Sequence, residues 1–260
     1  MNVHLLGTGS AVSDPERTTT MLAFEDEGTF FLVDCGGDAV QRLQLAGLAP
    51  ETIEAVILTH QHPDHISGFP LLIEKLWLLG RRDPIPVYGP PTTLALARRL
   101  FELFDTAKWD GLPERAWHPV EMTPGALLFE RGPFRVTSWP VEHPVPTIGL
   151  RVATGTGTVG YSCDTSPCDA VVELATDVEL LIHEGTGALP GVHSSPLEAA
   201  EAAREAGAER LVLVHIPAGA TEHDLVEARQ AFPATEWGVE GGTYSPTPVS
   251  ASAPSLRRSV

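Results

Sequence analysis

The sequence predicts an α/β protein in which helices pack in layers against buried sheets. Short apolar runs alternate with amphipathic helical segments over almost the whole chain, and elements mixed in this way form α/β layers. Hydrophobic residues make up 43% of the 260 residues, which is typical of a globular protein. A chain of this length buries enough surface to fold without disulfides or an obligatory metal.

The expected strands are short apolar runs, and the expected helices show a helical spacing of apolar residues. The strands are 3–6, 30–33, 55–58, 135–139, 158–162, 180–182 and 211–214, and the helices are 38–46, 66–79, 92–104, 196–205 and 222–231. The helix at 196–205 has the clearest ends. Ser195 precedes Pro196 and is followed three residues later by Glu198, as in a capping box, and Gly207 suits the end.

The pattern predicts one domain over residues 1–243 and a disordered tail at 244–260. No Pro/Gly linker of domain-separating quality occurs before residue 244, and the tail is rich in Ser, Pro and Ala with little to bury.

The net charge, the cysteine count and the distribution of apolar residues indicate which partners and which cellular compartment to expect. The chain carries 17 basic and 34 acidic residues, a formal charge of −17, which disfavours broad nucleic-acid binding unless bound cations reverse the sign locally. Three cysteines are too few for a disulfide framework and suit a reducing compartment. The N-terminus does not read as a signal peptide, and no apolar run approaches the ~20 residues of a membrane span. We therefore expect a cytoplasmic protein that does not bind a membrane.

The strongest chemical signal is a dense group of metal-capable side chains in the segment Thr59-His60-Gln61-His62-Pro63-Asp64-His65. It lies between an expected strand and an expected helix, so a tight turn can direct these side chains toward a common site. Imidazole nitrogen suits zinc and similar metals, and a carboxylate adds charge or bridges two ions. Packing alone gives no reason for this density, because each group costs free energy when it is buried without a partner. The alternative is a solvated polar turn.

Further candidate ligands stand just past other expected strands. They are His143 after 135–139, Asp164 after 158–162 and His215 after 211–214. Strands hold such side chains rigidly, which is why α/β proteins place sites at strand ends. Taken singly, each could equally be a capping or core polar residue, and only their shared position favours one site. Asp34 also follows a strand. It is a candidate partner that orients a ligand histidine, or else a turn residue.

The order of these residues resembles the metallo-β-lactamase superfamily, with His-x-His-x-Asp-His at 60–65 followed by His143, Asp164 and His215. The resemblance covers about residues 1 to 243 and implies a four-layer αββα sandwich with two divalent metal ions in a cleft at the sheet edges. Zinc is the expected metal, with manganese or iron as alternatives. The family pattern assigns His60, His62 and His143 to one ion, Asp64, His65 and His215 to the other, and Asp164 to a bridging position.

Finer matches are similar to ribonuclease Z and its phosphodiesterase relatives. They are Gly7-Thr8-Gly9-Ser10, Val33-Asp34-Cys35-Gly36, Tyr161-Ser162-Cys163-Asp164-Thr165, and His183-Glu184-Gly185-Thr186 followed by His193-Ser194-Ser195. In that branch a Glu and a later His form a pair near the metals, here Glu184 and His193. A carboxylate that orients an imidazole can tune a proton donor for the leaving oxygen. Asp64, Glu184 and His193 are thus the expected catalytic residues; the alternative for the pair is a helix-entry hydrogen bond without chemistry.

Departures from ribonuclease Z concern the substrate. The resemblance implies a long Gly/Pro-rich arm that grips tRNA, yet only residues 144–157 separate the strand before His143 from the next expected strand. Cys163 replaces a usual Gly, and Ile216-Pro217-Ala218-Gly219 replaces a Ser/Arg-containing stretch. We therefore expect a ribonuclease Z-like phosphodiesterase that lacks the arm and acts on small-molecule or short single-stranded substrates. The branch also implies a homodimer.

Two other functions remain open at this point. One is hydrolysis of an ester, lactone or aryl sulfate on the same metal centre, because a fold does not fix its substrate. The other is a non-catalytic binding module. The Glu184 and His193 pair favours phosphodiester hydrolysis, and the complete ligand set weighs against a binding module.

Overall fold

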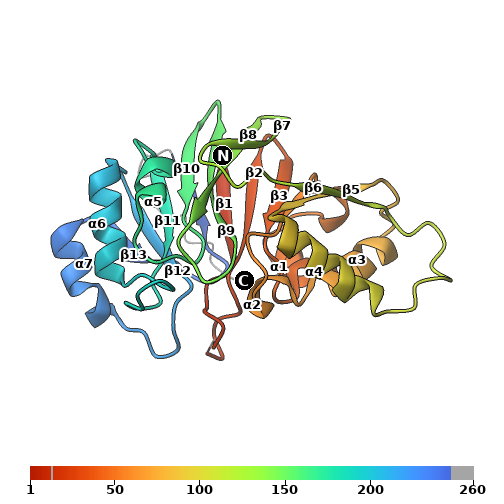
Figure 1. The fold of residues 1–260 in the computed structure, drawn as a ribbon, viewed down its shortest axis with the longest axis horizontal. Coiled ribbons are helices and arrows are strands. Elements are labelled where there is room, and N and C mark those ends of the chain that lie inside the picture. Colours follow the sequence, from red (N-terminus) through yellow and green to blue (C-terminus); the bar gives the residue numbers. More distant parts are fainter. Residues whose placement is uncertain (13, 247–260) are drawn as a thin grey trace, which may run out of the picture.

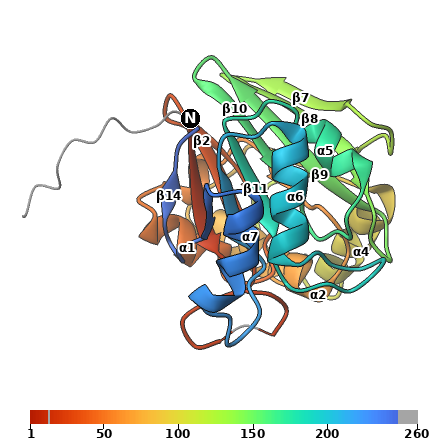
Figure 2. The same cartoon turned by 90° about the vertical axis from the view of Figure 1, so that its left-hand side faces the viewer.

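Two seven-stranded sheets face each other in the middle of the molecule, and helices cover the outer face of each (Figure 1). This is a computed structural model, which describes residues 1–12 and 14–246. The expected four-layer αββα sandwich is confirmed. Helices α1, α3 and α4 lie on one side, and α5, α6 and α7 lie on the other; Figure 2 looks onto α6 and α7.

The strands of each sheet run in a simple spatial order. The first sheet contains β14 (Thr243–Tyr244), β1 (Asn2–Gly7), β2 (Met21–Asp26), β3 (Thr29–Val33), β4 (Val56–Ile57), β5 (Ile85–Gly89) and β6 (Arg115–Pro119). The second contains β13 (Thr235–Trp237), β12 (Leu211–Val214), β11 (Leu180–Glu184), β10 (Gly157–Tyr161), β9 (Thr147–Thr154), β8 (Phe134–Val141) and β7 (Ala126–Arg131). The helices are α1 (Ala39–Leu45), α2 (Pro63–Ile66), α3 (Phe69–Leu78), α4 (Pro91–Glu102), α5 (Asp169–Leu174), α6 (Pro196–Ala206) and α7 (Val226–Ala231), with short 3-10 turns η1 (Pro50–Thr52) and η2 (Glu222–Leu225).

Each sheet has an antiparallel part and a parallel part. Strands β3 to β6 run parallel in the first sheet, and β10 to β13 run parallel in the second. The carboxyl ends of parallel strands lie at one edge, so the loops that follow them gather there. This arrangement places the candidate site.

Separate apolar clusters hold the layers together. The one between the sheets contains residues of both, and Phe31 of β3 meets Phe134 of β8 edge-on with 5.0 Å between ring centroids. A second cluster joins the first sheet to α1, α3 and α4, and a third joins the second sheet to α5, α6 and α7. Burial of apolar surface on three levels stabilises the fold.

Local sequence signals account for well-formed elements. The Ser195 hydroxyl accepts from the backbone N–H of Glu198, whose carboxylate accepts from the backbone N–H of Ser195, so the expected capping box of α6 is present. Gly207 ends this helix in the left-handed conformation at φ 71°.

The helix expected at 66–79 corresponds to α3, which begins at Phe69, whereas Ile66 is the last residue of α2. The chain bends at Gly68, where a Cβ atom would lie 2.2 Å from the carbonyl oxygen of Gly37, and α3 begins at Phe69 with Pro70 in its first turn. The predicted helix is therefore confirmed except at its start, which is displaced because packing against another loop imposes this bend.

The connection after β8 is shorter than the sequence indicated. Residues expected to be a loop at 144–157 contain β9, which pairs with β8 from Thr147 opposite Val141 onward. Only residues 142–146 join the two strands. No arm emerges at this position of the described chain.

The ordered body continues beyond residue 243. Tyr244 pairs with Val3 in β14, and the Ser245 hydroxyl donates to the side-chain oxygen of Asn2 at 2.8 Å. The first residues of the expected tail thus belong to the sandwich, and 247–260 lie outside the described residues. The longest described helix, α4, has 12 residues, and none of the described helices could cross a membrane.

Candidate metal centre

Polar side chains from both sheets meet at the edge where the parallel strands end. Asp34 follows β3, His60 follows β4, Asp164 follows β10 and His215 follows β12, while Glu184 is the last residue of β11. Asp34 and His215 take left-handed backbone angles, with φ 61° and 53°, as does Cys163 at 56°. Such conformations in residues other than glycine are costly, and they concentrate at functional sites.

The turn at residues 60–65 is fixed by the loop after β3. The backbone N–H of Cys35 donates to the carbonyl of His65 at 2.8 Å, and a Cβ atom on Gly36 would lie 1.7 Å from the carbonyl oxygen of Asp64. Only glycine at position 36 permits this close approach. His62 caps the one-turn helix α2, which then directs Asp64 and His65 toward the site.

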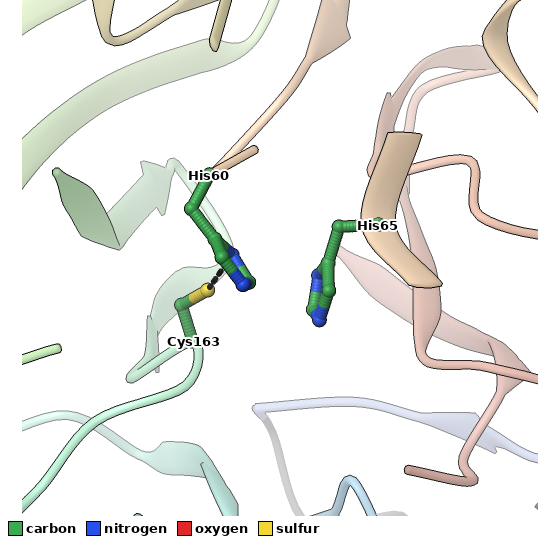
Figure 3. Close-up of side chains that lie close together, drawn as sticks. All are labelled: His60, His65 and Cys163. Carbon is green, nitrogen blue, oxygen red and sulfur yellow. Dashed lines mark hydrogen bonds between the residues drawn. The ribbon is translucent and has the colours of Figure 1, made fainter. Parts of the chain in front are cut away.

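Three imidazoles form a first group, His60, His62 and His143. The Nδ1 atom of His62 lies 3.1 Å from His60 Nε2 and 3.2 Å from His143 Nε2. Two of the remaining ring nitrogens have other neighbours: His143 Nδ1 donates to the carbonyl of Val192 at 2.8 Å, and His60 Nδ1 faces Thr59 and Cys163. Figure 3 shows the Cys163 thiol against the His60 ring.

A second group contains Asp64, His65, Asp164 and His215. Asp164 Oδ2 lies 3.5 Å from His65 Nε2 and 3.3 Å from His215 Nε2, and Asp64 Oδ2 lies at the same two distances from these nitrogens. Asp164 Oδ2 is also 3.9 Å from His60 Nε2 of the first group. Asp164 therefore lies between the two groups.

The buried atoms at the centre fit a bound cation. His65 Nε2 and Asp164 Oδ1 are buried and have no hydrogen-bond partner in the described part of the chain. Groups of this kind are normally satisfied, so unpartnered ones need an explanation. Three nitrogens in one group, and two nitrogens with two carboxylates in the other, are donor sets that zinc and similar metals accept. The His and Asp side chains present thus fit metal binding.

Burial and neighbouring charges shift the pKa values of the two groups in different directions. Burial lowers the pKa of His60 well below its usual value, so the ring is neutral, as metal ligation requires. Burial alone would raise the pKa of Asp164, but His215 and His65 hold it well below its usual range. Likewise, burial opposes protonation of His65, but Asp164 and Asp34 raise its pKa well above the ordinary value. Asp164 is therefore an anion deep in the protein.

Outer partners orient the rings of the second group. Asp34 Oδ2 accepts from His65 Nδ1 at 2.8 Å, so the expected contact of Asp34 with a candidate ligand is confirmed. The Thr186 hydroxyl lies 2.6 Å from His215 Nδ1. Such contacts fix which ring nitrogen faces the centre.

Glu184 and His193 face each other beside both groups. Glu184 Oε1 accepts from His193 Nδ1 at 2.9 Å and from the backbone N–H of Thr165 at 2.7 Å. The His193 ring lies 5.3 Å from that of His215 and 5.5 Å from that of His143, measured between centroids. Burial opposes protonation of His193, yet Glu184 outweighs this effect and raises the pKa of the imidazole.

Two polar residues were not singled out from the sequence. Thr59 was quoted only as the start of the histidine segment and Thr186 only as part of a motif, yet their hydroxyls contact the outer nitrogens of His60 and His215. The signal for both was their position, directly beside a candidate ligand or at a strand end. All seven expected metal ligands lie in the two groups, and Glu184 and His193 form the pair beside them.

Known proteins match this sequence along most of the chain. The model of the family described as "Beta-lactamase superfamily domain" matches residues 29–216 of this chain. A ribonuclease Z of Methanothermobacter thermautotrophicus is 32% identical over 91% of this chain and 94% of its own length, and that of Geobacillus kaustophilus is 30% identical over 94% and 99%. The first alignment is 294 positions long, more than the 260 residues of this chain, so that relative contains segments missing here.

Solved structures give the same picture. The metallo-beta-lactamase fold protein YhfI of Bacillus subtilis superimposes with a TM-score of 0.78 at 26% identity, covering 94% of this chain and 98% of its own. The short form of human tRNase Z has a TM-score of 0.78 at 25% identity and covers 95% and 100%. With its two-sheet sandwich and its groups of histidine and aspartate side chains at one edge, the chain belongs to the beta-lactamase superfamily, in its ribonuclease Z-like branch.

Proposed function

We propose that this chain is a dinuclear, zinc-dependent phosphodiesterase of small or short single-stranded substrates. The observation that carries the proposal is the convergence of seven side chains from both sheets around buried atoms without protein partners, His65 Nε2 and Asp164 Oδ1. Ribonuclease Z relatives along nearly the whole chain support phosphodiester chemistry.

The two groups would hold one ion each. His60, His62 and His143 would bind the first, and Asp64, His65 and His215 the second, with Asp164 shared between them. Two divalent ions lower the pKa of bound water and neutralise the charge of the attacked group. Zinc is favoured over manganese because five of the seven donors are imidazoles.

The protein's own residues would manage the protons of hydrolysis. Water oxygen forms a bond to phosphorus while the bond from phosphorus to the leaving oxygen breaks. Asp64, whose side chain is 13% exposed against 3% for Asp164, reaches the open side, where it can orient water and accept its proton. His193, 18% exposed and held by Glu184, would donate a proton to the leaving oxygen.

The surroundings favour a small substrate. The five-residue connection at 142–146 leaves no arm to grip a folded RNA, and the chain has an excess of acidic residues, 34 against 17 basic. Within the described residues, most basic side chains contact acidic partners or backbone carbonyls, such as Arg42 with Glu240 and Arg151 with the carbonyl of Leu174. Substrate charge would therefore be neutralised at the metal centre and not along an extended surface.

A substrate-class screen of the zinc-loaded protein tests the proposal. We expect turnover of bis-(p-nitrophenyl) phosphate and little cleavage of an acyl-homoserine lactone or an aryl sulfate. Lactone cleavage without diester turnover would reverse this assignment.

Matched variants connect the activity to the site. His62→Ala and Asp64→Ala should lose bound metal and diester turnover while keeping a folded circular-dichroism spectrum, whereas His118→Ala, a histidine stacked on Tyr88 outside the two groups, should keep both. Full metal content and full turnover in both site variants would rule out the proposal.

A further inference from the structure

One buried carboxylate, Asp34, contacts a candidate ligand of the second group and the residue that precedes a ligand of the first. Asp34 Oδ1 accepts from the backbone N–H of Thr59 at 2.8 Å, and Asp34 Oδ2 accepts from the Thr59 hydroxyl at 2.7 Å and from His65 Nδ1 at 2.8 Å. The Asp34 side chain is only 1% exposed. These contacts reach His65 of the second group directly, and through Thr59 they reach the residue beside His60 of the first group.

The direction of each hydrogen bond follows from the groups involved. A carboxylate only accepts, so the Thr59 hydroxyl donates its single proton to Asp34. Its lone pairs are then free to accept a proton from His60 Nδ1, which lies 3.2 Å away. With the proton on Nδ1, the lone pair of His60 is on Nε2, the atom that faces His62.

We propose that Thr59 is a positioning residue for the first ion, and that Asp34 positions one imidazole in each group, His65 directly and His60 through the Thr59 hydroxyl. The inference rests on the proposed function only in requiring that both groups bind metal. Its consequence is that one side chain sets the tautomer and orientation of a ligand at two positions.

The Cys163 thiol is the competing acceptor for His60 Nδ1. Its sulfur lies 3.6 Å from this nitrogen, a contact drawn as a dashed line in Figure 3, and sulfur is a weak acceptor. The Thr59 hydroxyl is closer and is itself fixed by Asp34, so we assign the orienting contact to Thr59.

Zinc titration of the metal-free protein by calorimetry, with zinc chloride alone, tests the assignment. Thr59→Val removes the hydroxyl at nearly constant shape and should weaken one of the two ions by about 10- to 100-fold, the usual loss when an outer partner of a ligand is removed. Thr59→Ser keeps the hydroxyl and should bind both ions as the wild type does. Asp34→Asn should weaken both.

The chain offers a matched control in Thr93, which is fully buried and whose hydroxyl has no hydrogen-bond partner in the described residues. Thr93→Val should leave both ions unchanged. A Thr59→Val protein that binds zinc like Thr93→Val would overturn the proposal, as would weakening by Cys163→Ala but not by Thr59→Val, or a wild type that binds fewer than two ions.

A measurement on the wild type covers the case in which Thr59→Val does not fold. Nitrogen NMR of histidine-labelled, zinc-loaded protein should show His60 protonated at Nδ1; protonation at Nε2 contradicts the assignment. Two bound ions without diester turnover would refute the proposed function and leave the role of Thr59 standing.

Discussion

His193 is the residue whose proposed role is most open to a kinetic test. A proton donor matters only when the leaving oxygen needs a proton. With a dinucleotide, whose leaving group is an alkoxide, His193→Ala should lose about 10²- to 10⁴-fold in kcat, the usual contribution of general acid catalysis. With bis-(p-nitrophenyl) phosphate, which releases a stable phenolate, the loss should be much smaller.

Glu184→Gln should show the same dependence on the leaving group, because the Glu184 carboxylate accepts from His193 Nδ1. Steady-state kinetics with both substrates check this. Equal losses of His193→Ala on the two substrates would assign His193 to substrate binding instead.

At the scale of single residues, the sequence predicted best the candidate ligands that lie within a few residues of one another. His60, His62, Asp64 and His65 stand together in the printed sequence, and the structure places them at one edge. Thr59 and Thr186 could not be identified, since a threonine at a strand end has many ordinary uses. Their hydroxyls can be recognised as partners of His60 and His215 only from the three-dimensional structure.

At the scale of elements, the start of α1 provides a pH-dependent contribution to stability. Asp38 caps this helix by accepting from the backbone N–H of Gln41 and also pairs with Lys75. Burial would raise the Asp38 pKa, but Lys75 and the Gln41 N–H lower it below the ordinary 3.8. Folding therefore favours the ionised form, so this stabilisation is present above pH about 4 and is lost as the pH falls through the folded-state pKa.

Asp38→Asn keeps a capping acceptor and removes the charge. At neutral pH we expect a loss of about 0–1 kcal/mol in the free energy of unfolding, because both partners are a third exposed. Asp38→Ala should lose a further 0.5–2 kcal/mol, roughly the worth of a cap. In urea titrations, the deficit of Asp38→Asn should shrink below pH about 4; an undiminished deficit at low pH would exclude the charge as its cause.

The loop after β3 gives a second prediction for an element. A methyl group at position 36 would lie 1.7 Å from the Asp64 carbonyl oxygen, so Gly36→Ala must push the turn at 60–65 away. We expect a loss of about 1–3 kcal/mol in unfolding free energy, as for other overpacked sites, together with weaker zinc binding.

Gly155 provides the control for this variant, since a Cβ atom there has no neighbour within 4 Å. Gly155→Ala should unfold and bind zinc like the wild type. Chemical denaturation and zinc titration compare the two, and normal behaviour of Gly36→Ala would show that the loop tolerates displacement.

The elements that the sequence predicted best are those with a complete local signal. The α6 helix, with Ser195 at its start and Gly207 at its end, was expected at 196–205 and spans Pro196–Ala206. Strand β9 was missed because Gly149 and Arg151 interrupt its apolar character, and β5 because Pro86 is unusual in a strand. Both depend on neighbouring strands, which no local pattern reveals.

At the scale of the whole molecule, metal removal should abolish activity and leave the fold. We expect the apolar clusters between and outside the sheets to sustain the fold without ions. After chelation, the far-ultraviolet circular dichroism should be unchanged. Zinc at about 100 times its dissociation constant should add roughly 2.7 kcal/mol per independent site to the unfolding free energy, seen as a higher Tm. Collapse of the spectrum on chelation would mean that the ions are needed for folding.

The division of the candidate ligands between the sheets has a mechanical consequence. His60, His62, Asp64 and His65 follow strand β4 of the first sheet, whereas His143, Asp164 and His215 follow strands of the second. Ions bound by residues of both sets would link the two sheets at this edge of the sandwich. Occupancy would then limit how far the sheets can slide or part at this edge, so that rigidity and catalytic competence would be acquired in the same step.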